Sequence, residues 1–456
     1  MDKNKISQMN YYLLSYFNIN TLNKGIIKEN INKIEIKLKN INESTDKLKY
    51  LSLSCIFGAF LGDSIGSNCE FSKPSADNYK YIYKNVNGRF LIGEITDDSE
   101  LAMSAAFAYI DANDKNDQRI QDLIYYYFCI WKESHPKDMG YATFNSLKFW
   151  NPTYTIEQTK FDKKVQSLIV SQNFSSLSNG VLMRISTFIV FYFYTNYEKI
   201  NRIINNYFNL DIYYKELSEE LLNLLFDIFN KVYINAKVTH PNPEISISAA
   251  VFSLLVLTGM IKNNANDIYS LFKIISISKK FIEYNKDDSY KNYAKITQKK
   301  FAEIIYEIEK NLNISVYNMM GYYIHGFKLS IYFLYKISKM GEIIDNKLYY
   351  KIMCQICNFG GDTDTNCAIV GTMIGPLIGY KNFPPELFDK FIKYFPEKRT
   401  QYTSAFMYIY VTHLEEKYYQ HKNYMQNYGY KNDFNISKNP SFEKILDFLT
   451  KKYRIE

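Results

Sequence analysis

Residues 359–365 of this chain read Phe-Gly-Gly-Asp-Thr-Asp-Thr, and residues 366–375 continue with Asn-Cys-Ala-Ile-Val-Gly-Thr-Met-Ile-Gly. The second segment is apolar and small, which predicts a helix entered from a Gly-Gly turn. Side chains at positions i and i+2 do not share a helical face, so Asp362 and Asp364 must lie before this helix or in its first turn. Two unpaired carboxylates about 4 Å apart repel by roughly 4 kcal/mol at an effective dielectric of 20. Helix-terminal N–H groups, a shared proton or a metal cation are the candidates that could offset this repulsion.

A second acidic cluster precedes another apolar segment. Residues 93–100 read Gly-Glu-Ile-Thr-Asp-Asp-Ser-Glu. Thr96 or Asp97 is a plausible helix N-cap, and capping alone would account for one or two of these acids. Together with residues 362–365, however, the cluster offers four carboxylates and two or more hydroxyls. Four negative charges match two divalent cations, and ligands that are all oxygen favour Mg, Mn or Ca over Zn.

Glycines recur at helical spacing in two places. Gly58, Gly62 and Gly66 form one stripe, and Gly371 and Gly375 repeat the spacing. An interior glycine costs about 1 kcal/mol relative to alanine, so a whole stripe predicts close approach of another backbone. Tight helix packing alone and a functional site are equally good explanations of the first stripe. The polar residues at positions 63 (Asp) and 70 (Glu) are the groups near enough to serve such a site.

Two further motifs carry possible substrate contacts. Ser178, Asn179 and Gly180 form a turn entering a helix, and such a loop presents backbone N–H groups that suit a phosphate. Asn-Gly is also a common turn, so this motif is weak by itself. His240 precedes Pro241 and Pro243, which place it rigidly, although a lone histidine more often has a structural role.

Composition favours long helices in a protein with a sizeable core. The 456 residues are 47% hydrophobic and 17% aromatic, with only 18 Gly and 10 Pro. That length allows two or three domains, or one large domain with insertions. The net charge of +8 is spread widely, which favours a solvated, mildly basic surface over a groove for nucleic acid. We therefore expect no nucleic-acid partner.

Cysteine usage and the termini indicate a cytoplasmic protein. The chain has six cysteines, and its single C-x-x-C, Cys354 to Cys357, has no second pair that would complete a zinc site. We interpret it as an interior helical pair with reduced thiols. The N-terminus lacks the apolar core of a signal peptide. Residues 245–261 are the best candidate for a membrane span, but they are short and contain several Ser and Thr, so we expect a buried core helix and no membrane association.

With these motifs assembled, the chain resembles the ADP-ribosylglycohydrolase family, which includes dinitrogenase reductase-activating glycohydrolase and the ADP-ribosylarginine and ADP-ribosylserine hydrolases. The resemblance runs from about residue 54 to residue 380 and on through the helix expected near residues 400–419. It rests on five blocks in order: residues 58–63 with Glu70-Phe71; residues 96–102; residues 178–180 with Met183-Arg184; His240-Pro241 with Pro243-Glu244; and residues 361–365. Ser178 stands where the family usually has a glycine.

The resemblance implies an all-α fold, a compact orthogonal helical domain with a cleft that holds two Mg²⁺ or Mn²⁺ ions. It assigns the metal-ligand role to Thr96, Asp97, Asp98, Asp362, Asp364 and Thr365. It matches Ser178, Asn179 and Gly180 to the loop that holds the substrate's diphosphate, and His240 to a residue near the same end of the cleft. Glu70 matches an acidic residue implicated in catalysis, and Glu70 or Asp98 is our candidate for the proton relay.

Composition and the resemblance together predict the domain organisation. Residues 1–48 form a Lys- and Asn-rich extension, in which residues 33–48 could be an amphipathic helix. Residues 49–456 form the catalytic domain, with insertions near 196–235 and 262–312 compared with commoner members of the family.

The function implied is metal-dependent hydrolysis of the bond between ADP-ribose and a modified protein side chain, or of a small ADP-ribose conjugate. Such a reaction passes through an oxocarbenium-like state and needs an oriented ribose and an activated water. The alternatives are a catalytically silent relative that binds ADP-ribose or serves structurally, and a dimetal phosphohydrolase with a helical core. The four intact aspartates argue against the silent relative, and the order of the blocks argues against the phosphohydrolase. The linkage, whether to Arg, to Ser or in O-acetyl-ADP-ribose, does not follow from these motifs.

Overall fold

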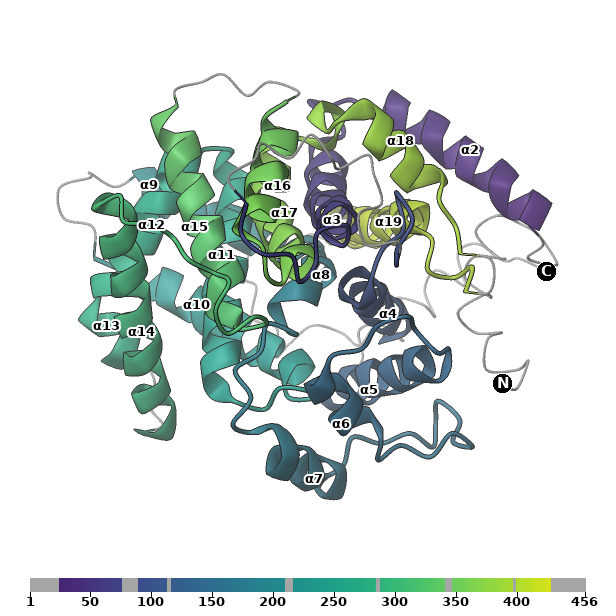
Figure 1. Cartoon of the computed structure of the whole chain (residues 1–456), viewed down its shortest axis with the longest axis horizontal. Helices are drawn as coiled ribbons and strands as arrows, with labels where there is room; N and C mark the ends of the chain where they lie inside the picture. Colours follow the sequence, from purple (N-terminus) through teal and green to yellow (C-terminus); the bar gives the residue numbers. More distant parts are fainter. Residues whose placement is uncertain are drawn as a thin grey trace.

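The computed structural model describes residues 24–75, 89–112, 116–209, 216–283, 288–340, 347–396 and 399–427. Within these ranges the regular elements are helices and there is no strand (Figure 1). A single antiparallel bridge joins Ser178 to Tyr322. The all-α prediction is confirmed.

The helices follow one another with short connections. In chain order the α-helices are α2 (Lys24–Asn40), α3 (Lys47–Gly66), α4 (Asp97–Ala112), α5 (Asp117–Glu133), α6 (Tyr141–Leu147), α7 (Lys163–Asn173), α8 (Ser186–Thr195), α9 (Tyr197–Asn209), α10 (Glu219–Ala236), α11 (Pro243–Lys262), α12 (Ala265–Ile277), α13 (Lys279–Glu283), α14 (Asp288–Glu309), α15 (Tyr323–Lys339), α16 (Leu348–Phe359), α17 (Thr363–Ile378), α18 (Pro385–Lys393) and α19 (Met407–Asn427). Three short 3₁₀ turns are η1 (Leu182–Arg184), η3 (Tyr380–Asn382) and η4 (Ser404–Phe406).

Helices α3 and α17 pack against each other more extensively than any other described pair. Gly58 faces Gly371 near one end of this contact, and Gly66 faces Thr363 near the other, so the two helices run antiparallel. A Cβ atom on Gly66 would lie 2.6 Å from the Thr363 carbonyl carbon, which is closer than non-bonded carbons approach. The close approach predicted from the glycine spacing is confirmed.

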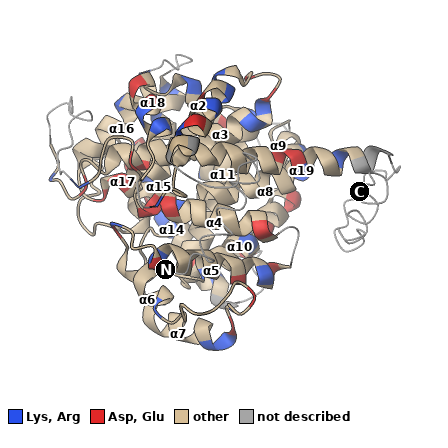
Figure 2. Cartoon of the chain, turned by 90° about the vertical axis from the view of Figure 1, so that its right-hand side faces the viewer, with Lys and Arg blue, Asp and Glu red and all other residues tan. Residues whose placement is uncertain are grey.

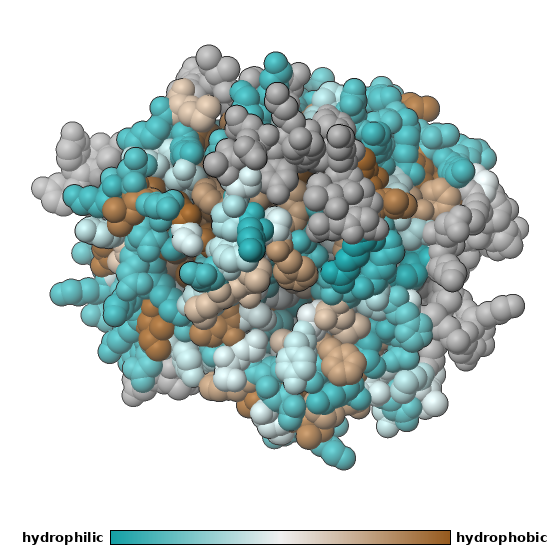
Figure 3. All heavy atoms as spheres, viewed as in Figure 1, coloured by the Kyte–Doolittle hydropathy of each residue, from teal (hydrophilic) through white to brown (hydrophobic). Residues whose placement is uncertain are grey.

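The remaining helices surround this pair in two groups. Helix α11 contacts α10, α12, α14 and α17, and helix α4 contacts α5, α8 and α19. The segments predicted to be insertions form α9 and α10, and α12 to α14, and they pack against α11 rather than standing apart from it. Hydrophilic residues cover most of the described surface seen in Figure 3, and hydrophobic residues lie there in separate small patches.

Part of the N-terminal extension is a packed helix. Helix α2 buries Ile27, Ile31, Ile34 and Leu38, and it lies beside α18 (Figure 1). The helix predicted over residues 33–48 is wrong in its bounds. Side-chain acceptors in residues 41–46 bond nearby backbone N–H groups and form a turn, which separates α2 from α3. The division of the chain at residue 48 stays a prediction.

The helix expected near residues 400–419 also differs in its bounds. The chain forms the 3₁₀ turn η4 first, in which the Phe406 N–H donates to the Thr403 carbonyl at 2.9 Å. Helix α19 begins only at Met407 and continues to Asn427. A 3₁₀ turn is a common way to tighten the entry to an α-helix.

Two helices, α3 and α11, are long and apolar enough to cross a membrane by length and composition. Their apolar windows are 89% and 94% buried by the rest of the protein, as the core helices of a folded domain are. Cys354 and Cys357 lie on α16, the second of them fully buried, as expected for an interior helical pair. Cys69 and Cys367 approach the Cys357 thiol from the neighbouring segments.

Candidate active site

Three chain segments converge at one end of the α3–α17 pair. The turn after α3 carries Glu70, the start of α4 carries the first pair of aspartates, and the start of α17 carries the second pair. The Thr363 hydroxyl donates to the Gly66 carbonyl at 2.7 Å, and the Phe71 N–H donates to the Gly361 carbonyl at 2.7 Å. In Figure 2, acidic residues gather near the labels of α17, α15 and α4.

The Gly-Gly turn sets where the α17 aspartates lie. Gly360 and Gly361 have φ values of +68° and +79°, a conformation that side chains other than glycine rarely adopt. Helix α17 therefore begins at Thr363, so Asp362 precedes the helix and Asp364 lies in its first turn. These positions are the ones expected from the i, i+2 spacing.

Glu70, Asp362 and Asp364 form a tight acidic cluster. One carboxylate oxygen from each lies within 4.8 Å of the others, and Asp364 is only 3% exposed. Glu70 thus joins the residues that could hold a cation, although the sequence motif assigned it a catalytic role. We find the cluster at the point where the glycine stripe of α3 ends against α17.

The start of α4 is capped without using its own aspartates. The Thr96 hydroxyl accepts from the Asp98 N–H at 3.4 Å. Asp63, on α3, accepts from the Thr96 N–H at 3.0 Å and from the Ser99 hydroxyl at 2.5 Å. Simple capping therefore does not explain Asp97 and Asp98, because Thr96 and Asp63 already perform it.

Asp98 connects the two acidic clusters. The Thr365 hydroxyl donates to Asp98 Oδ1 at 3.2 Å. Asp98 is 2% exposed, and its Oδ2 is buried with no hydrogen-bond partner among the described residues. A buried acceptor without a donor is costly, and a cation is one group that would satisfy it. Asp97 is half-buried at the first position of α4.

Burial and mutual repulsion raise the pKa values of these acids. Burial, with the charges of Asp138 and Asp362, raises the pKa of Glu70 to about 8. Burial is also the largest cause of the raised pKa of Asp98 and of Asp364. Repulsion from the neighbouring carboxylates adds to it, so both pKa values lie well above their usual range. Such a site resists ionisation unless positive charge enters it.

The donor set fits a hard divalent cation. Every candidate ligand supplies oxygen, from the carboxylates of Asp97, Asp98, Asp362, Asp364 and Glu70 and from the hydroxyls of the two threonines at 96 and 365. Mg²⁺, Mn²⁺ and Ca²⁺ prefer such ligands, and a bound cation would reverse the pKa shifts. The assignment of each residue as a metal ligand stays a prediction.

The raised pKa values predict that the metal-free protein loses stability as the pH rises. The pKa of Glu70 moves from 4.5 to about 8 and that of Asp63 from 3.8 to about 6. The folded state holds protons that the unfolded chain has released, so this stabilisation is complete below the unfolded pKa and is lost as the pH passes the folded pKa. We expect the unfolding temperature in chelator to fall between about pH 4 and about pH 8.

Calorimetry with and without Mg²⁺ would check this prediction. Mg²⁺ should raise the unfolding temperature most at the alkaline end, where the carboxylates lose their protons. An equal effect of Mg²⁺ at both ends of the range would contradict the assignment of these acids to a cation site.

The Ser-Asn-Gly loop lies directly beside the acidic cluster. Asn179 Nδ2 donates to Asp362 Oδ2 at 2.7 Å, and Ser178 Oγ lies 2.7 Å from His240 Nε2. A Cβ atom on Gly180 would lie 2.9 Å from the same imidazole nitrogen, so only glycine lets the ring take this place. The structure thus brings together all four predicted substrate-binding residues.

Arg184 forms hydrogen bonds that connect this loop to the segment around Thr239. Its guanidinium donates to the Gly180 carbonyl, to Thr239 Oγ1 at 2.8 Å and to Asn235 Oδ1 at 3.3 Å. Arg184 is 1% exposed and forms no ion pair with a described carboxylate. Burial lowers its pKa to about 9, which leaves it charged at neutral pH.

The helix predicted after this loop does not begin there. The chain forms the three-residue 3₁₀ turn η1, and α8 starts only at Ser186. Such a short turn has little helix dipole to offer an anion. The buried guanidinium of Arg184 supplies positive charge at this end of the site.

Sequence reasoning missed three supporting residues. Asp63 caps α4, Arg184 carries the Ser-Asn-Gly loop, and Arg89 lies 3.4 Å from Glu70 Oε2 while its other nitrogen pairs with Asp138 at 2.6 Å. Asp63 and Arg184 belong to the motifs that carry the resemblance, so their positions were visible although their roles were not. No motif singles out Arg89.

Glu100, the last acid of the α4 motif, has a structural role. Its carboxylate accepts two hydrogen bonds from Arg399, each at 2.7 Å, and one from Trp131 Nε1 at 2.8 Å. This buried ion pair ties the segment before η4 to α4 and α5. Its acceptor oxygens are occupied, which separates Glu100 from the metal-ligand candidates.

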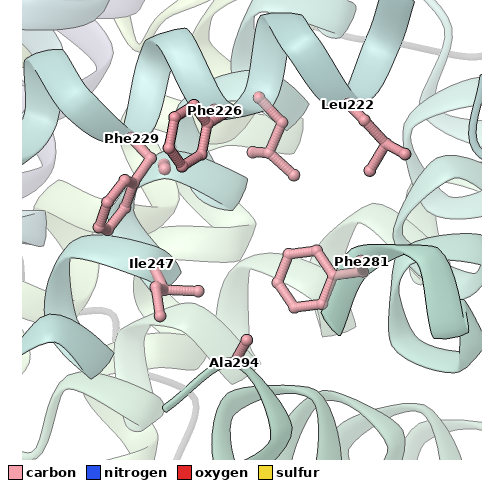
Figure 4. A pocket seen from close by; sticks show the side chains of 8 residues that line it. Leu222, Phe226, Phe229, Ile247, Phe281 and Ala294 are labelled. Atoms are coloured by element: carbon pink, nitrogen blue, oxygen red, sulfur yellow. The ribbon is translucent and has the colours of Figure 1, made fainter. Parts of the chain in front are cut away.

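An apolar pocket elsewhere is not suited to this chemistry. It lies among α10, α11, α13 and α14, has a volume of about 40 Å³, and is lined by Leu222, Leu225, Phe226, Phe229, Ile247, Ala250, Phe281 and Ala294 (Figure 4). These side chains offer no oxygen or nitrogen to a metal or a phosphate.

Comparisons with known proteins identify the family of the chain. A sequence model of the family described as ADP-ribosylglycohydrolase matches residues 45–411, which include every motif discussed above. A protein of Acanthamoeba polyphaga mimivirus, provisionally named an ADP-ribosyl glycohydrolase, is 23% identical over 348 residues, covering 74% of this chain and 89% of that protein. A solved structure titled an ADP-ribosylglycohydrolase-related protein complex aligns with 80% of this chain and 98% of its own, with a TM-score of 0.49 and 15% identity. The match to the family model covers most of the chain, and the protein belongs to the ADP-ribosylglycohydrolase family.

Proposed function

We propose that this protein hydrolyses the glycosidic bond between ADP-ribose and a modified protein side chain, with divalent cations held in the acidic cluster. Reversal of mono-ADP-ribosylation is the reaction that this describes, and a small ADP-ribose conjugate is a related substrate. Membership of the family supports a glycohydrolase. The metal dependence and the choice of substrate are our proposal.

One contact carries the proposal. Asn179 Nδ2 donates to Asp362 Oδ2 at 2.7 Å, so the loop suited to an anion adjoins the cluster suited to cations. ADP-ribose has these features in the same order, because its diphosphate is attached to the ribose that bears the bond to be cleaved. The buried positive charge of Arg184 lies on the loop side, and the carboxylates lie on the other.

The acidic cluster would hold and orient the ribose. Cations bound there would polarise the ribose hydroxyls and lower the pKa of a bound water. Asp362 lies directly before α17 and Asp364 lies in its first turn, and the Thr365 hydroxyl donates to Asp98 Oδ1. Placement on helix ends of this kind fixes the reacting groups before the substrate arrives, which is a major part of catalysis.

Glu70 and Asp98 are the residues able to move a proton. Asp98 Oδ2 has no hydrogen-bond partner among the described residues, so it would either bind a cation or accept a proton from a water, and each use excludes the other. Glu70 is oriented by Arg89, which is itself fixed by Asp138. Held by Arg89, the Glu70 carboxylate would exchange a proton with a water or a departing group.

A direct assay tests the proposed function. Purified protein would be incubated with peptides ADP-ribosylated on Arg or on Ser, in Mg²⁺ and in chelator, and released ADP-ribose would be quantified. We expect release in Mg²⁺ that stops in chelator, with one linkage preferred. Binding of ADP-ribose without release from either peptide would overturn the proposal in favour of a binding protein.

The expected partners follow from the reaction. They are ADP-ribosylated proteins or small ADP-ribose conjugates, and we propose that the protein meets them in the cytoplasm. Basic and acidic residues intermingle on α2 and α18 in Figure 2, as on an ordinary solvated surface.

A further inference from the structure

A chain of hydrogen bonds runs from Arg184 to Ser178. Arg184 Nη2 donates to Thr239 Oγ1 at 2.8 Å, Thr239 Oγ1 lies 2.8 Å from His240 Nδ1, and His240 Nε2 lies 2.7 Å from Ser178 Oγ. A serine hydroxyl beside an imidazole has two opposite uses. It gives its proton to the ring as a nucleophile, or it takes a proton from the ring and offers its own elsewhere.

The Thr239 hydroxyl decides between these uses. Thr239 is fully buried, and an arginine can only donate, so Thr239 Oγ1 is the acceptor of the bond from Arg184. Its own hydrogen needs an acceptor, and His240 Nδ1 is the one in reach among the described residues. A buried donor without an acceptor is costly, so this arrangement is favoured. Nδ1 is then unprotonated.

His240 must then carry its proton on Nε2. A neutral imidazole has one N–H, and a hydrogen bond accepted at Nδ1 assigns it to the other nitrogen. Burial and the nearby charge of Arg184 lower the pKa of His240 to about 3, so the ring is neutral at physiological pH. The Nε2–H therefore donates to Ser178 Oγ.

Ser178 is left with a proton to offer. Its oxygen accepts from His240 Nε2 at 2.7 Å and from the Ser176 hydroxyl at 3.3 Å, which uses both lone pairs. Ser178 is half-exposed, and its neighbour Asn179 contacts the acidic cluster. Its hydroxyl hydrogen therefore points away from the ring, where a ligand can receive it.

We propose that the hydrogen bonds from Arg184 through Thr239 to His240 fix the Ser178 hydroxyl as a donor toward the ligand, so that Ser178, in the loop expected to hold the diphosphate, is not a base-activated nucleophile. The inference rests on the proposed function, because it takes the anion to be the diphosphate of ADP-ribose. In serine hydrolases the far nitrogen of the histidine carries a proton and faces a carboxylate that stabilises the imidazolium. Here that nitrogen accepts from a hydroxyl held by a cation, which disfavours the imidazolium.

Nitrogen NMR on protein labelled with ¹⁵N-histidine tests the relay without any assay of function. The chain has five histidines, and the signals lost in His240→Gln assign the residue. We expect a protonated Nε2 and an unprotonated Nδ1 at neutral pH. Thr239→Val should disturb this state and Thr239→Ser should keep it, since serine retains the hydroxyl. A protonated Nδ1 in the wild type would overturn the proposal.

Binding by calorimetry tests the role of Ser178. Loss of a hydrogen bond to a charged group should weaken the binding of ADP-ribose on the order of 10- to 100-fold in Ser178→Ala, and Thr239→Val should weaken it in the same direction. Binding of adenosine, which lacks the diphosphate, should not change. In turnover, Ser178→Ala should raise KM much more than it lowers kcat. Ser171→Ala, on the exposed face of α7, is the matched control.

The outcomes separate the two proposals. If the wild type and Ser178→Ala bind ADP-ribose equally, the role of Ser178 is wrong while the proposed function stands. If the wild type binds no ADP-ribose, the proposed function fails and the diphosphate role fails with it. Labelling of Ser178 by a fluorophosphonate, a reagent for activated serines, would show a nucleophile and overturn the inference.

Discussion

Asp364→Asn is expected to abolish metal-dependent hydrolysis while the protein remains folded. Asp364 is buried in the first turn of α17, and one of its oxygens lies within 4.8 Å of oxygens from Glu70 and Asp362. Asparagine keeps the shape and removes the charge that would hold a cation. Loss of groups that merely support a metal ligand costs about 10- to 100-fold, so loss of the ligand itself should lower kcat/KM by at least about 100-fold.

The same substitution should stabilise the metal-free protein. Burial and the charges of Glu70, Asp362 and Asp98 raise the pKa of Asp364, so its ionised form is disfavoured in the fold. Without that charge the repulsion falls, and the unfolding temperature in chelator should rise at alkaline pH. Mg²⁺ at 100 times its Kd should stabilise the wild type by about 2.7 kcal/mol, and this stabilisation should be lost in the variant.

Thermal unfolding and the peptide assay measure both effects, and Asp389→Asn is the control. Asp389 lies on α18, where it pairs with Lys393 one turn away, and it is not part of the acidic cluster. That variant should keep its activity and its response to Mg²⁺. Full activity of Asp364→Asn in Mg²⁺ would remove the acidic cluster from the mechanism.

Local sequence patterns predicted the close packing of two helices and the position of two aspartates, because both features depend on residues a few positions apart in the chain. The glycine spacing at residues 58–66 and 371–375 predicted close helix packing, because that property depends on one face of each helix. The i, i+2 spacing predicted that Asp362 and Asp364 lie before a helix or in its first turn, because that prediction depends on helical periodicity alone. The roles of the motif residues came from resemblance to the family rather than from these patterns.

The supporting contacts could not be predicted, because they join residues far apart in the chain. Asp63 accepts from the Thr96 N–H, and Arg184 donates to Thr239. No local sequence pattern predicts either pairing. The proton arrangement at His240 depends on four side chains from two segments. Helix ends were misjudged for a related reason: residues 41–46 turn through side-chain bonds that an amphipathic pattern does not reveal.

Gly62→Ala is expected to force α3 and α17 apart. A Cβ atom there would lie 2.7 Å from the Cys367 carbonyl carbon and 3.2 Å from the Ala368 nitrogen, and it would also meet the Cys367 carbonyl oxygen. All of these are backbone atoms of α17, which cannot rotate away as a side chain can. Overpacking costs about 1–3 kcal/mol and occasionally more, while alanine regains about 1 kcal/mol of helix propensity. We expect a net loss of about 2 kcal/mol or more in the free energy of unfolding, measured in urea.

Gly259→Ala separates this packing effect from the effect of replacing a helical glycine. Gly259 lies in α11, and the nearest atom to a Cβ there is the terminal methyl of Ile268 at 3.1 Å, which can move. The unfolding free energy of that variant should change by less than about 1 kcal/mol. Equal effects of the two substitutions would mean that the glycine stripe does not hold the helices together.

Gly62→Ala should lower kcat/KM even where the variant is fully folded. Such a loss cannot come from unfolding, so it would connect the helix packing to the geometry of the site. Glu70 follows the end of α3, and Asp364 lies at the start of α17, so the distance between their carboxylates depends on how closely the two helices approach. A displacement of about 1 Å in a catalytic group can cost about 100-fold in rate. Under conditions where the variant is fully folded, kcat/KM should therefore drop by more than 10-fold, because this misplacement acts on the folded protein. Wild-type activity in a destabilised but folded Gly62→Ala would show that the acids keep their spacing through the turn at Gly360 and Gly361 instead.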